Sequence, residues 1–188
     1  MESGVASRPL EDLNQYYQNL SHFVYRSGFV MKPLFDRARQ EVMRVAYAEG
    51  EEERVLQAVQ TVVDEGLAEP ILIGRNKVIE YRIKKLGLRI RPGIDVEIVD
   101  PEDDPRYREY WQAYHKLRER HGVDVETAKA RIRTNTTIIG AMMVHLGHSD
   151  AMICGTFGKY DQHYRRVSDI IPFREGVRDA SALHLLIM

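Results

Sequence analysis

The sequence predicts an α/β fold, in which a parallel sheet carries helices on both faces and forms three layers. Four short apolar runs, at residues 45–48, 71–74, 96–99 and 151–154, have the length of strands. The run at 71–74 is too continuously apolar to leave one face of a strand in water. Segments with apolar residues at three- and four-residue intervals separate the runs, as amphipathic helices do. Strands that alternate with such helices form parallel sheets with helices on their faces.

The helices between these runs carry start and stop signals of their own. Acidic residues at 51–53 open the helix after the first run, at the positive end of its dipole, and Gly66 ends it as a C-terminal cap. Asn76 is positioned to cap the next helix. Asp104 and Pro105 stand in the preferred order for the start of a long helix. Two shorter helices are expected before the fourth run.

The two ends of the chain differ from this pattern. Residues 13–24 repeat apolar side chains at helical spacing, and Pro33 is expected to limit how far that helix continues. Residues 183–188 are typical of a buried strand that has only begun, so both ends of the chain look cut; the alternative is a C-terminal strand paired inside the sheet. The predicted domains are a linker and helix at 1–33, a first α/β domain at 34–158 and the start of a second at 159–188.

Composition and charge exclude several classes of protein. The 27 basic and 28 acidic residues leave a net charge of −1 and no strongly basic half, which argues against a nucleic-acid partner. The first residues lack the apolar core of a signal peptide, and no apolar run approaches the ~20 residues that span a bilayer. The single cysteine, Cys154, cannot form an internal disulfide, which fits a reducing compartment. The sequence therefore predicts a soluble, cytoplasmic protein with no membrane partner.

The loop after the fourth run is the most informative candidate for a binding site. Ligands of open parallel sheets bind beyond the carboxyl ends of the strands, where this loop must lie. Its glycines allow close backbone approach, and its N–H groups and neighbouring cations suit a phosphate. A solvated basic turn is the alternative. The candidate ligand-binding residues are Gly155, Thr156, Gly158, Lys159, Tyr160 and Arg165.

Other candidates are weaker. His145 and His148 are three residues apart at a helix end without a third ligand nearby, so no metal site is predicted. Asp161 and His163 can form an acid–base pair only if their side chains face each other. Residues two apart on a helix need not do so. Cys154 is expected to be a small core residue inside the fourth strand. The fingerprints of P-loop enzymes, Rossmann proteins and serine hydrolases are missing from the sequence.

Several stretches resemble the phosphate acetyl/butyryltransferase family. They are residues 48–56 (AEGEEERVL), 70–75 (PILIGR) and 140–144 (GAMMV) leading to 149–155 (SDAMICG). The likeness runs in order over about residues 35–188. It implies an isocitrate/isopropylmalate-dehydrogenase-like (phosphotransacetylase) fold, with two α/β domains around an acyl-CoA cleft, of which this chain holds an incomplete part.

Further stretches are similar to the transferase-like C-terminal domain of bacterial NADP-dependent malic enzymes. These are residues 1–9 (MESGVASRP), 23–25 (FVY), 31–33 (MKP) and 150–156 (DAMICGT). The resemblance implies that malate decarboxylation, with NADP and a divalent Mg or Mn ion, belongs to a covalently linked catalytic domain upstream. It also implies that this region binds acetyl-CoA or a related acyl-CoA as an effector, contributes to a homo-oligomer and holds no cofactor of its own.

The chain departs from active members of the transferase family. Their loop carries a His-Ser-Thr stretch and an arginine followed by proline. Here Gly158, Lys159 and Tyr160 replace the stretch, Arg165 falls on the arginine and Arg166 replaces the proline. No catalytic residue is therefore assigned, and the chain alone is expected to be inactive. Three functions remain open: a regulatory acetyl-CoA-binding domain, an active phosphate acetyl/butyryltransferase, or a structural oligomerisation domain that uses the helix at residues 13–23.

Overall fold

A computed structural model describes residues 12–178, 180 and 181 of the chain. Of these described residues, those between 38 and 180 form one compact unit, and residues 12–37 belong to a second. Helix α1 (Leu13–Gln40) contains Pro33, so the prediction that this proline limits the helix is wrong. Proline removes one helical hydrogen bond and crowds the preceding turn, but it does not fix where a helix ends. The predicted boundaries at residues 33 and 158 stay predictions, and the strand predicted at 183–188 lies outside the described residues.

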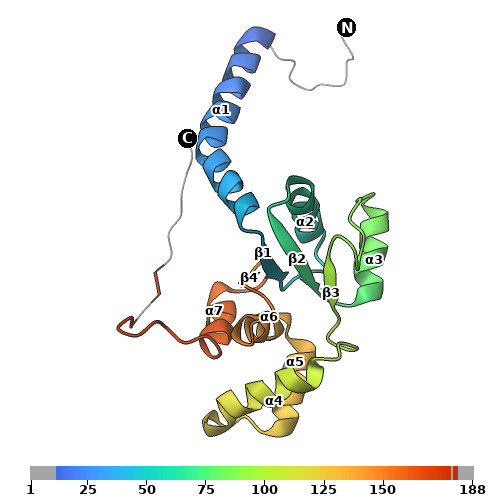
Figure 1. The fold of residues 1–188 in the computed structure, drawn as a ribbon, viewed down its shortest axis with the longest axis vertical. Helices are drawn as coiled ribbons and strands as arrows, with labels where there is room; N and C mark the ends of the chain where they lie inside the picture. Colours follow the sequence, from blue (N-terminus) through green and yellow to red (C-terminus); the bar gives the residue numbers. More distant parts are fainter. Residues whose placement is uncertain (1–11, 179, 182–188) are drawn as a thin grey trace. The chain divides into compact units, whose positions relative to one another are not determined.

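The larger unit is built on a parallel sheet of four strands (Figure 1). The strands are β1 (Met43–Tyr47), β2 (Ala68–Ile73), β3 (Glu97–Val99) and β4 (Ala151–Ile153). Their order in the sheet is β3-β2-β1-β4. Tyr47, near the carboxyl end of β1, is paired with Leu72 on one side and Ile153 on the other. All four strands therefore present their carboxyl ends at the same edge of the sheet.

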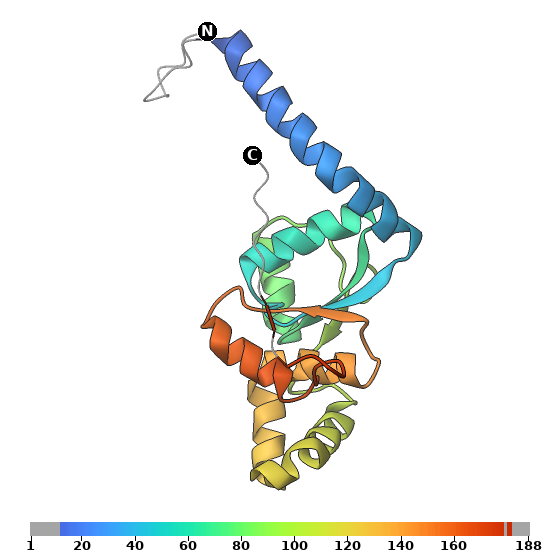
Figure 2. The same ribbon diagram turned by 90° about the vertical axis from the view of Figure 1, so that its left-hand side faces the viewer.

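Helices cover both faces of this sheet (Figures 1 and 2), which confirms the predicted α/β fold class. Helices α2 (Glu53–Glu65) and α3 (Asn76–Lys85) pack on one face. On the opposite face α6 (Thr136–His145) packs against the sheet, and α4 (Tyr107–Arg118), α5 (Val125–Thr134) and α7 (Tyr160–Ser168) pack around α6 in the same hydrophobic core. In the part of the chain that the structure describes, no helix combines the length and apolarity needed to cross a membrane.

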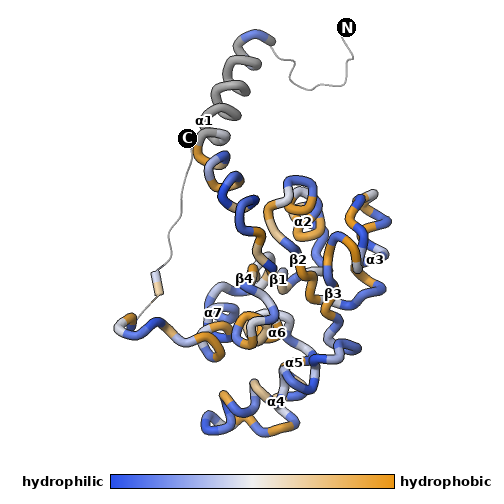
Figure 3. Tube along the Cα trace, in the orientation of Figure 1, coloured by the Kyte–Doolittle hydropathy of each residue, from blue (hydrophilic) through white to orange (hydrophobic). Residues whose placement is uncertain are grey.

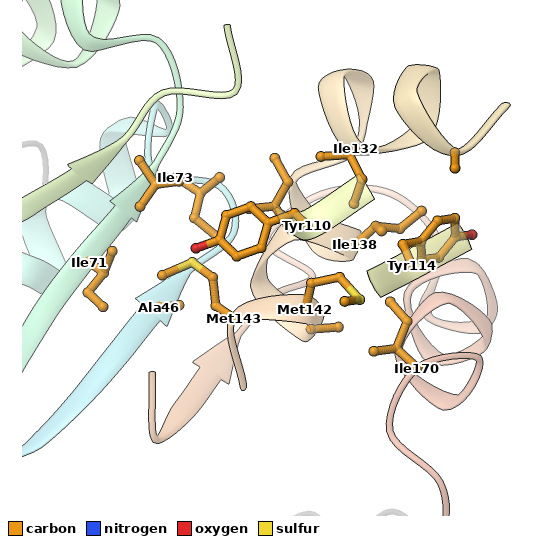
Figure 4. Close-up of a cluster of buried hydrophobic side chains, with 14 of the residues drawn as sticks. Ala46, Ile71, Ile73, Tyr110, Tyr114, Ile132, Ile138, Met142, Met143 and Ile170 are labelled. Carbon is orange, nitrogen blue, oxygen red and sulfur yellow. The ribbon is translucent and has the colours of Figure 1, made fainter. Parts of the chain in front are cut away.

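The two hydrophobic cores follow from the period of two along a strand. Neighbouring side chains point to opposite faces, so Ile71 and Ile73 enter the core under α6, whereas Leu72 enters the core under α2 and α3. Figure 3 shows this concentration of hydrophobic residues in the strands and in α6. Figure 4 shows how Met142 and Met143 of α6 and Tyr110 of α4 fill the first core. Burial on both faces explains why β2 reads as a continuous apolar run.

Two helix starts differ from the prediction. Asn76 is the first residue of α3, and the cap position is held by Arg75, whose side chain makes no capping bond. The backbone N–H of Asn76 instead donates to the carboxylate of Asp100 at 3.0 Å, so a residue from the loop after β3 replaces a local cap. Helix α4 begins at Tyr107, two residues after the predicted proline. Sequence signals located these starts to within a few residues, which is the usual precision.

Candidate functional site

The order of the strands locates a crevice between β1 and β4. From β1 the chain proceeds outward through β2 to β3, and it then returns to the other side of β1 to form β4. Ligands of open α/β sheets bind where the strand order reverses, beyond the carboxyl ends. The two segments that meet there are Glu49-Gly50, which follows β1, and the loop 155–158, which follows β4.

The first of these segments is held tightly against the sheet. The backbone N–H of Gly50 donates to the carbonyl of Ile73 at 3.1 Å. A Cβ atom at Gly50 would lie 2.8 Å from the Ile73 nitrogen, so only glycine fits. This close approach directs the side chain of Glu49 toward β4, where its carboxylate accepts the backbone N–H of Gly155 at 2.9 Å. The Glu49 side chain is 4% exposed, so a buried carboxylate lies at the centre of the crevice.

His163 of α7 completes this arrangement. Its Nε2 lies 2.9 Å from the carbonyl oxygen of Phe157, and its Nδ1 lies 3.0 Å from Oγ1 of Thr137. A carbonyl only accepts hydrogen bonds, so Nε2 carries the proton. Nδ1 is also 4.0 Å from the Glu49 carboxylate. The carboxylate neighbour of His163 is therefore Glu49, which is far away in the sequence, and not Asp161, which was the only partner that local spacing suggested.

The loop 155–158 is fixed at both ends and open in the middle. Gly155 and Gly158 have φ angles of 101° and 95°, which other residues rarely adopt. A Cβ atom at Gly158 would also lie 3.0 Å from Nε2 of His163. Thr156 and Phe157 are exposed. Among the described residues, the backbone N–H groups of Thr156 and Gly158 have no acceptor, so they remain free to bind a ligand.

A cavity of about 420 Å³ lies on the β2 side of this loop. Three glutamates and Arg82 line it, and the Arg82 guanidinium donates to the backbone carbonyl of Glu51. The Glu51 carboxylate is itself bound by Arg75 at 2.9 and 2.8 Å, which lowers the pKa of Glu51. The lining residues are Ala48, Glu49, Glu51, Glu52, Ile73, Gly74, Arg82, Thr134, Thr136 and Phe157. This predominance of carboxylates disfavours an anion in the cavity.

A second cavity, of about 400 Å³, lies between the loop and α7. Cys154, Tyr160 and Tyr164 line it, and the two tyrosine rings stack with their centroids 5.9 Å apart. Strand β4 ends at Ile153, so Cys154 lies beyond the strand and half-buried beside the cavity. The prediction that it is a core residue inside the strand is wrong because β4 is shorter than the apolar run. Burial, reinforced by the charge of Glu49, raises the pKa of the Cys154 thiol.

The predicted cations lie near the loop but do not share one face of α7. Lys159 occupies the N-cap position, and Arg165 lies in the last turn. Six positions on a helix separate two side chains by roughly 120° around the axis, so these two cations diverge. Within the described part of the chain, neither side chain forms an ion pair. The structure thus brings Gly155, Thr156, Gly158, Lys159 and Tyr160 together, and it leaves Arg165 on another face of the same helix.

Comparison with known proteins agrees with this architecture. The family model for phosphate acetyl/butaryl transferase matches residues 29–188. The chain belongs to the phosphate acetyl/butaryl transferase family. A phosphotransacetylase from Streptococcus pyogenes superimposes on the chain with a TM-score of 0.69 and 25% identity, covering 79% of this chain and 45% of that one. The resemblance to this family and the phosphotransacetylase fold are therefore confirmed.

The resemblance to malic enzymes is also confirmed. The NAD-dependent malic enzyme of Rhizobium meliloti is 54% identical over 99% of this chain, which covers 24% of that protein. The NADP-dependent malic enzyme of Escherichia coli is 50% identical over the whole chain, which covers 25% of that protein. The chain thus spans about a quarter of the length of the malic enzymes it matches.

Sequence reasoning missed Glu49 and His163 as members of one site. The sequence left Glu49 open between a site residue and part of a turn before a helix, and it paired His163 only with its neighbour Asp161. The local signal was the charged residue Glu49 directly after a buried strand, at the edge where ligands bind. Identifying His163 as its neighbour required the packing of α7 against α6, where Thr137 contacts the imidazole.

Proposed function

We propose that this chain is a regulatory module that binds acetyl-CoA, or a related acyl-CoA, and controls a malic enzyme to which it is covalently linked. One observation carries the proposal. Essentially the whole chain matches malic enzymes, while residues 29–188 match a family named for acyl transfer to phosphate. A domain of transferase ancestry inside a malic enzyme is suited to sense an acyl-CoA without consuming it.

The phosphates of the ligand are proposed to lie on the α7 side of the loop 155–158. The free N–H groups of Thr156 and Gly158 and the ammonium of Lys159, at the N-terminus of α7, provide donors and positive charge there. The cavity on the β2 side is lined by three glutamates and would repel a phosphate. Arg165 is proposed to contact a second phosphate or a more distant part of the ligand, because it lies on another face of α7.

Loss of acyl transfer is proposed from the composition of the loop. The resemblance implies a His-Ser-Thr stretch in active transferases, where Gly158, Lys159 and Tyr160 stand here. Acyl transfer needs donors and cations positioned around a developing charge. The replaced stretch removes hydroxyl and imidazole donors from that position, whereas the glycines and Lys159 still suit binding. The domain is therefore proposed to bind without turnover.

The activity of the whole protein is proposed to be oxidative decarboxylation of malate to pyruvate. The cofactor would be NADP, with Mg or Mn, in a region outside this chain; the relatives include both NAD- and NADP-dependent enzymes. Within the described residues, no group of three or more His, Cys, Asp or Glu side chains is arranged to hold a metal ion. A homo-oligomer in the cytoplasm is proposed as the working state.

Malate oxidation by the full-length protein tests the regulatory role. Acetyl-CoA should change kcat or KM for malate in a saturable way, and a coupling of ~1–3 kcal/mol corresponds to a change of 5- to 150-fold. Free CoA and acetyl phosphate serve as comparison ligands. Malate kinetics that do not respond to any of them would refute the regulatory role.

An active phosphate acyltransferase is the second candidate, and the family match favours it. Formation of acetyl phosphate from acetyl-CoA and phosphate distinguishes it from the first. Turnover would assign catalysis to the same loop despite its altered residues. The third candidate, a structural oligomerisation domain, requires neither binding nor turnover.

A further inference from the structure

We infer that Glu49 and His163 are positioning residues that hold the loop 155–158 ready for its ligand. The inference rests on the proposed function, because a prepared loop matters only if it binds something. Glu49 accepts the N–H of Gly155, where the loop begins, and His163 donates to the carbonyl of Phe157, near its other end.

Glu49 fixes the first end. Its carboxylate accepts the N–H of Gly155 at 2.9 Å, and its side chain is buried at 4% exposure. Burial of a carboxylate costs free energy unless hydrogen bonds and nearby charges compensate. The turn at Gly50 prevents Glu49 from moving into solvent, because the Gly50 backbone packs directly on Ile73. The position of Gly155 is thus set by the end of β1, although Gly155 follows β4.

His163 fixes the second end. Nε2 donates to the Phe157 carbonyl at 2.9 Å, and the ring is held in turn by Thr137, whose Oγ1 lies 3.0 Å from Nδ1. Thr137 is buried at 2% exposure in the first turn of α6, so the ring is anchored to the core. An added Cβ atom at Gly158 would lie 3.0 Å from Nε2 of the imidazole, so a side chain there would crowd the ring. The four residues of the loop are held at both ends, and only the exposed middle is left for a ligand.

This arrangement lowers the cost of binding. A loop that is already ordered does not lose its conformational freedom when a ligand arrives, so more of the contact energy appears as affinity. The two polar contacts are also specific in geometry. A side chain that keeps the hydrogen bond should keep the loop ordered, and one that removes it should release that end of the loop.

The test uses paired variants of the full-length protein. Glu49→Gln and His163→Gln keep an oxygen acceptor for Gly155 and an N–H donor for Phe157, whereas Glu49→Ala and His163→Ala remove them. Ile139→Ala is the matched control, because it creates a cavity in the core below α6 without touching the loop. Hydrogen exchange of the peptide that contains residues 155–158 reports loop order, and titration with acetyl-CoA reports affinity.

The inference predicts that exchange of the Gly155 amide, which donates to Glu49, accelerates about tenfold or more in Glu49→Ala, and that affinity falls about fivefold or more in both alanine variants. Both glutamine variants should restore slow exchange and affinity, and Ile139→Ala should change neither. Equal exchange in Glu49→Ala and Ile139→Ala, or glutamine variants as defective as the alanines, would overturn the inference. If the wild-type protein does not bind acetyl-CoA, the proposed function fails, and the exchange rates alone decide whether the two residues order the loop.

Discussion

The carboxylate of Glu49 accepts the backbone N–H of Gly155 at 2.9 Å, and this bond joins the loops that follow β1 and β4. These two strands are neighbours in the sheet but are separated in the sequence by β2, β3 and the five α-helices α2 to α6. The bond lies where the strand order reverses, which is the position at which open α/β sheets bind ligands. The candidate site is therefore a property of the sheet topology as much as of the glycine-containing loop.

Substitution of Arg165 tests the contribution of the cation that lies apart from the loop. Arg165→Ala should weaken acetyl-CoA binding about tenfold, because a charge-assisted hydrogen bond to a phosphate would be lost. Arg89→Ala is the matched control, since Arg89 is 78% exposed and pairs with Asp64 of α2. Titration calorimetry compares the two variants. Equal affinities for wild type and Arg165→Ala would remove this arginine from the site.

Substitution of Gly158 tests the contact with His163. Gly158→Ala should lower the free energy of unfolding by about 1–3 kcal/mol, because alanine is strained at a φ of 95° and its Cβ would crowd the imidazole. Gly147→Ala is the control, because its φ is also positive, at 75°, but nothing lies within 4 Å of the added Cβ. Urea unfolding gives both values. A loss no greater at Gly158 than at Gly147 would mean that the imidazole accommodates the methyl group.

The pair formed by Glu51 and Arg75 predicts a dependence of stability on acid pH. Arg75 lowers the pKa of Glu51 in the folded protein, whereas the unfolded chain keeps a value near ~4.3. The stabilisation is therefore present above that value and is lost as the pH falls through the lowered pKa of the folded state. Because the pair is partly exposed, it contributes on the order of 1 kcal/mol or less.

Unfolding measurements between pH 7 and pH 3 check this sign. The difference in unfolding free energy between wild type and Glu51→Gln should favour wild type at pH 7 and shrink below about pH 5. Glu80→Gln, an exposed position on α3, serves as the control for a general change of net charge. A difference that stays constant over this range would contradict the lowered pKa of Glu51.

Alkylation of Cys154 tests access to the cavity beside α7. Its raised pKa keeps the thiol protonated at neutral pH, so iodoacetamide should react at pH 8 more slowly than with a free thiol of pKa ~8.5. Acetyl-CoA should slow the reaction further if the ligand covers the cavity. Peptide mapping by mass spectrometry quantifies the modification, with urea-unfolded protein as the reference. Modification as fast in the folded as in the unfolded protein would contradict the burial.

The fold class could be predicted from the sequence because the residues of the two cores follow local patterns of apolar spacing. The continuously apolar strand β2 needs both of its faces covered. The apolar faces of the helices pack on them. Details that depend on contacts between residues far apart in the sequence could not be predicted. Asp100 takes the place of a cap for α3, and β4 ends one residue before Cys154. At Pro33 a local signal was misleading, because proline usually disfavours a helix interior but α1 continues through this residue.

The candidate site was predictable only in part for the same reason. Gly155 and Gly158 follow an apolar run in the sequence, and that pattern points to a ligand loop. Their partners Glu49 and His163 come from segments that meet only when β1, β4 and α7 are packed together. The divergence of Lys159 and Arg165 depends on where α7 begins, which sequence signals locate to within a few residues.

Titration calorimetry of acetyl-CoA into the full-length protein, with an assay for acetyl phosphate formation on the same sample, tests the central claim most directly. We expect saturable binding without turnover, and loss of affinity in Arg165→Ala. Binding accompanied by acetyl phosphate formation would make the domain a transferase. The absence of binding would contradict the account and leave only a structural role for this chain.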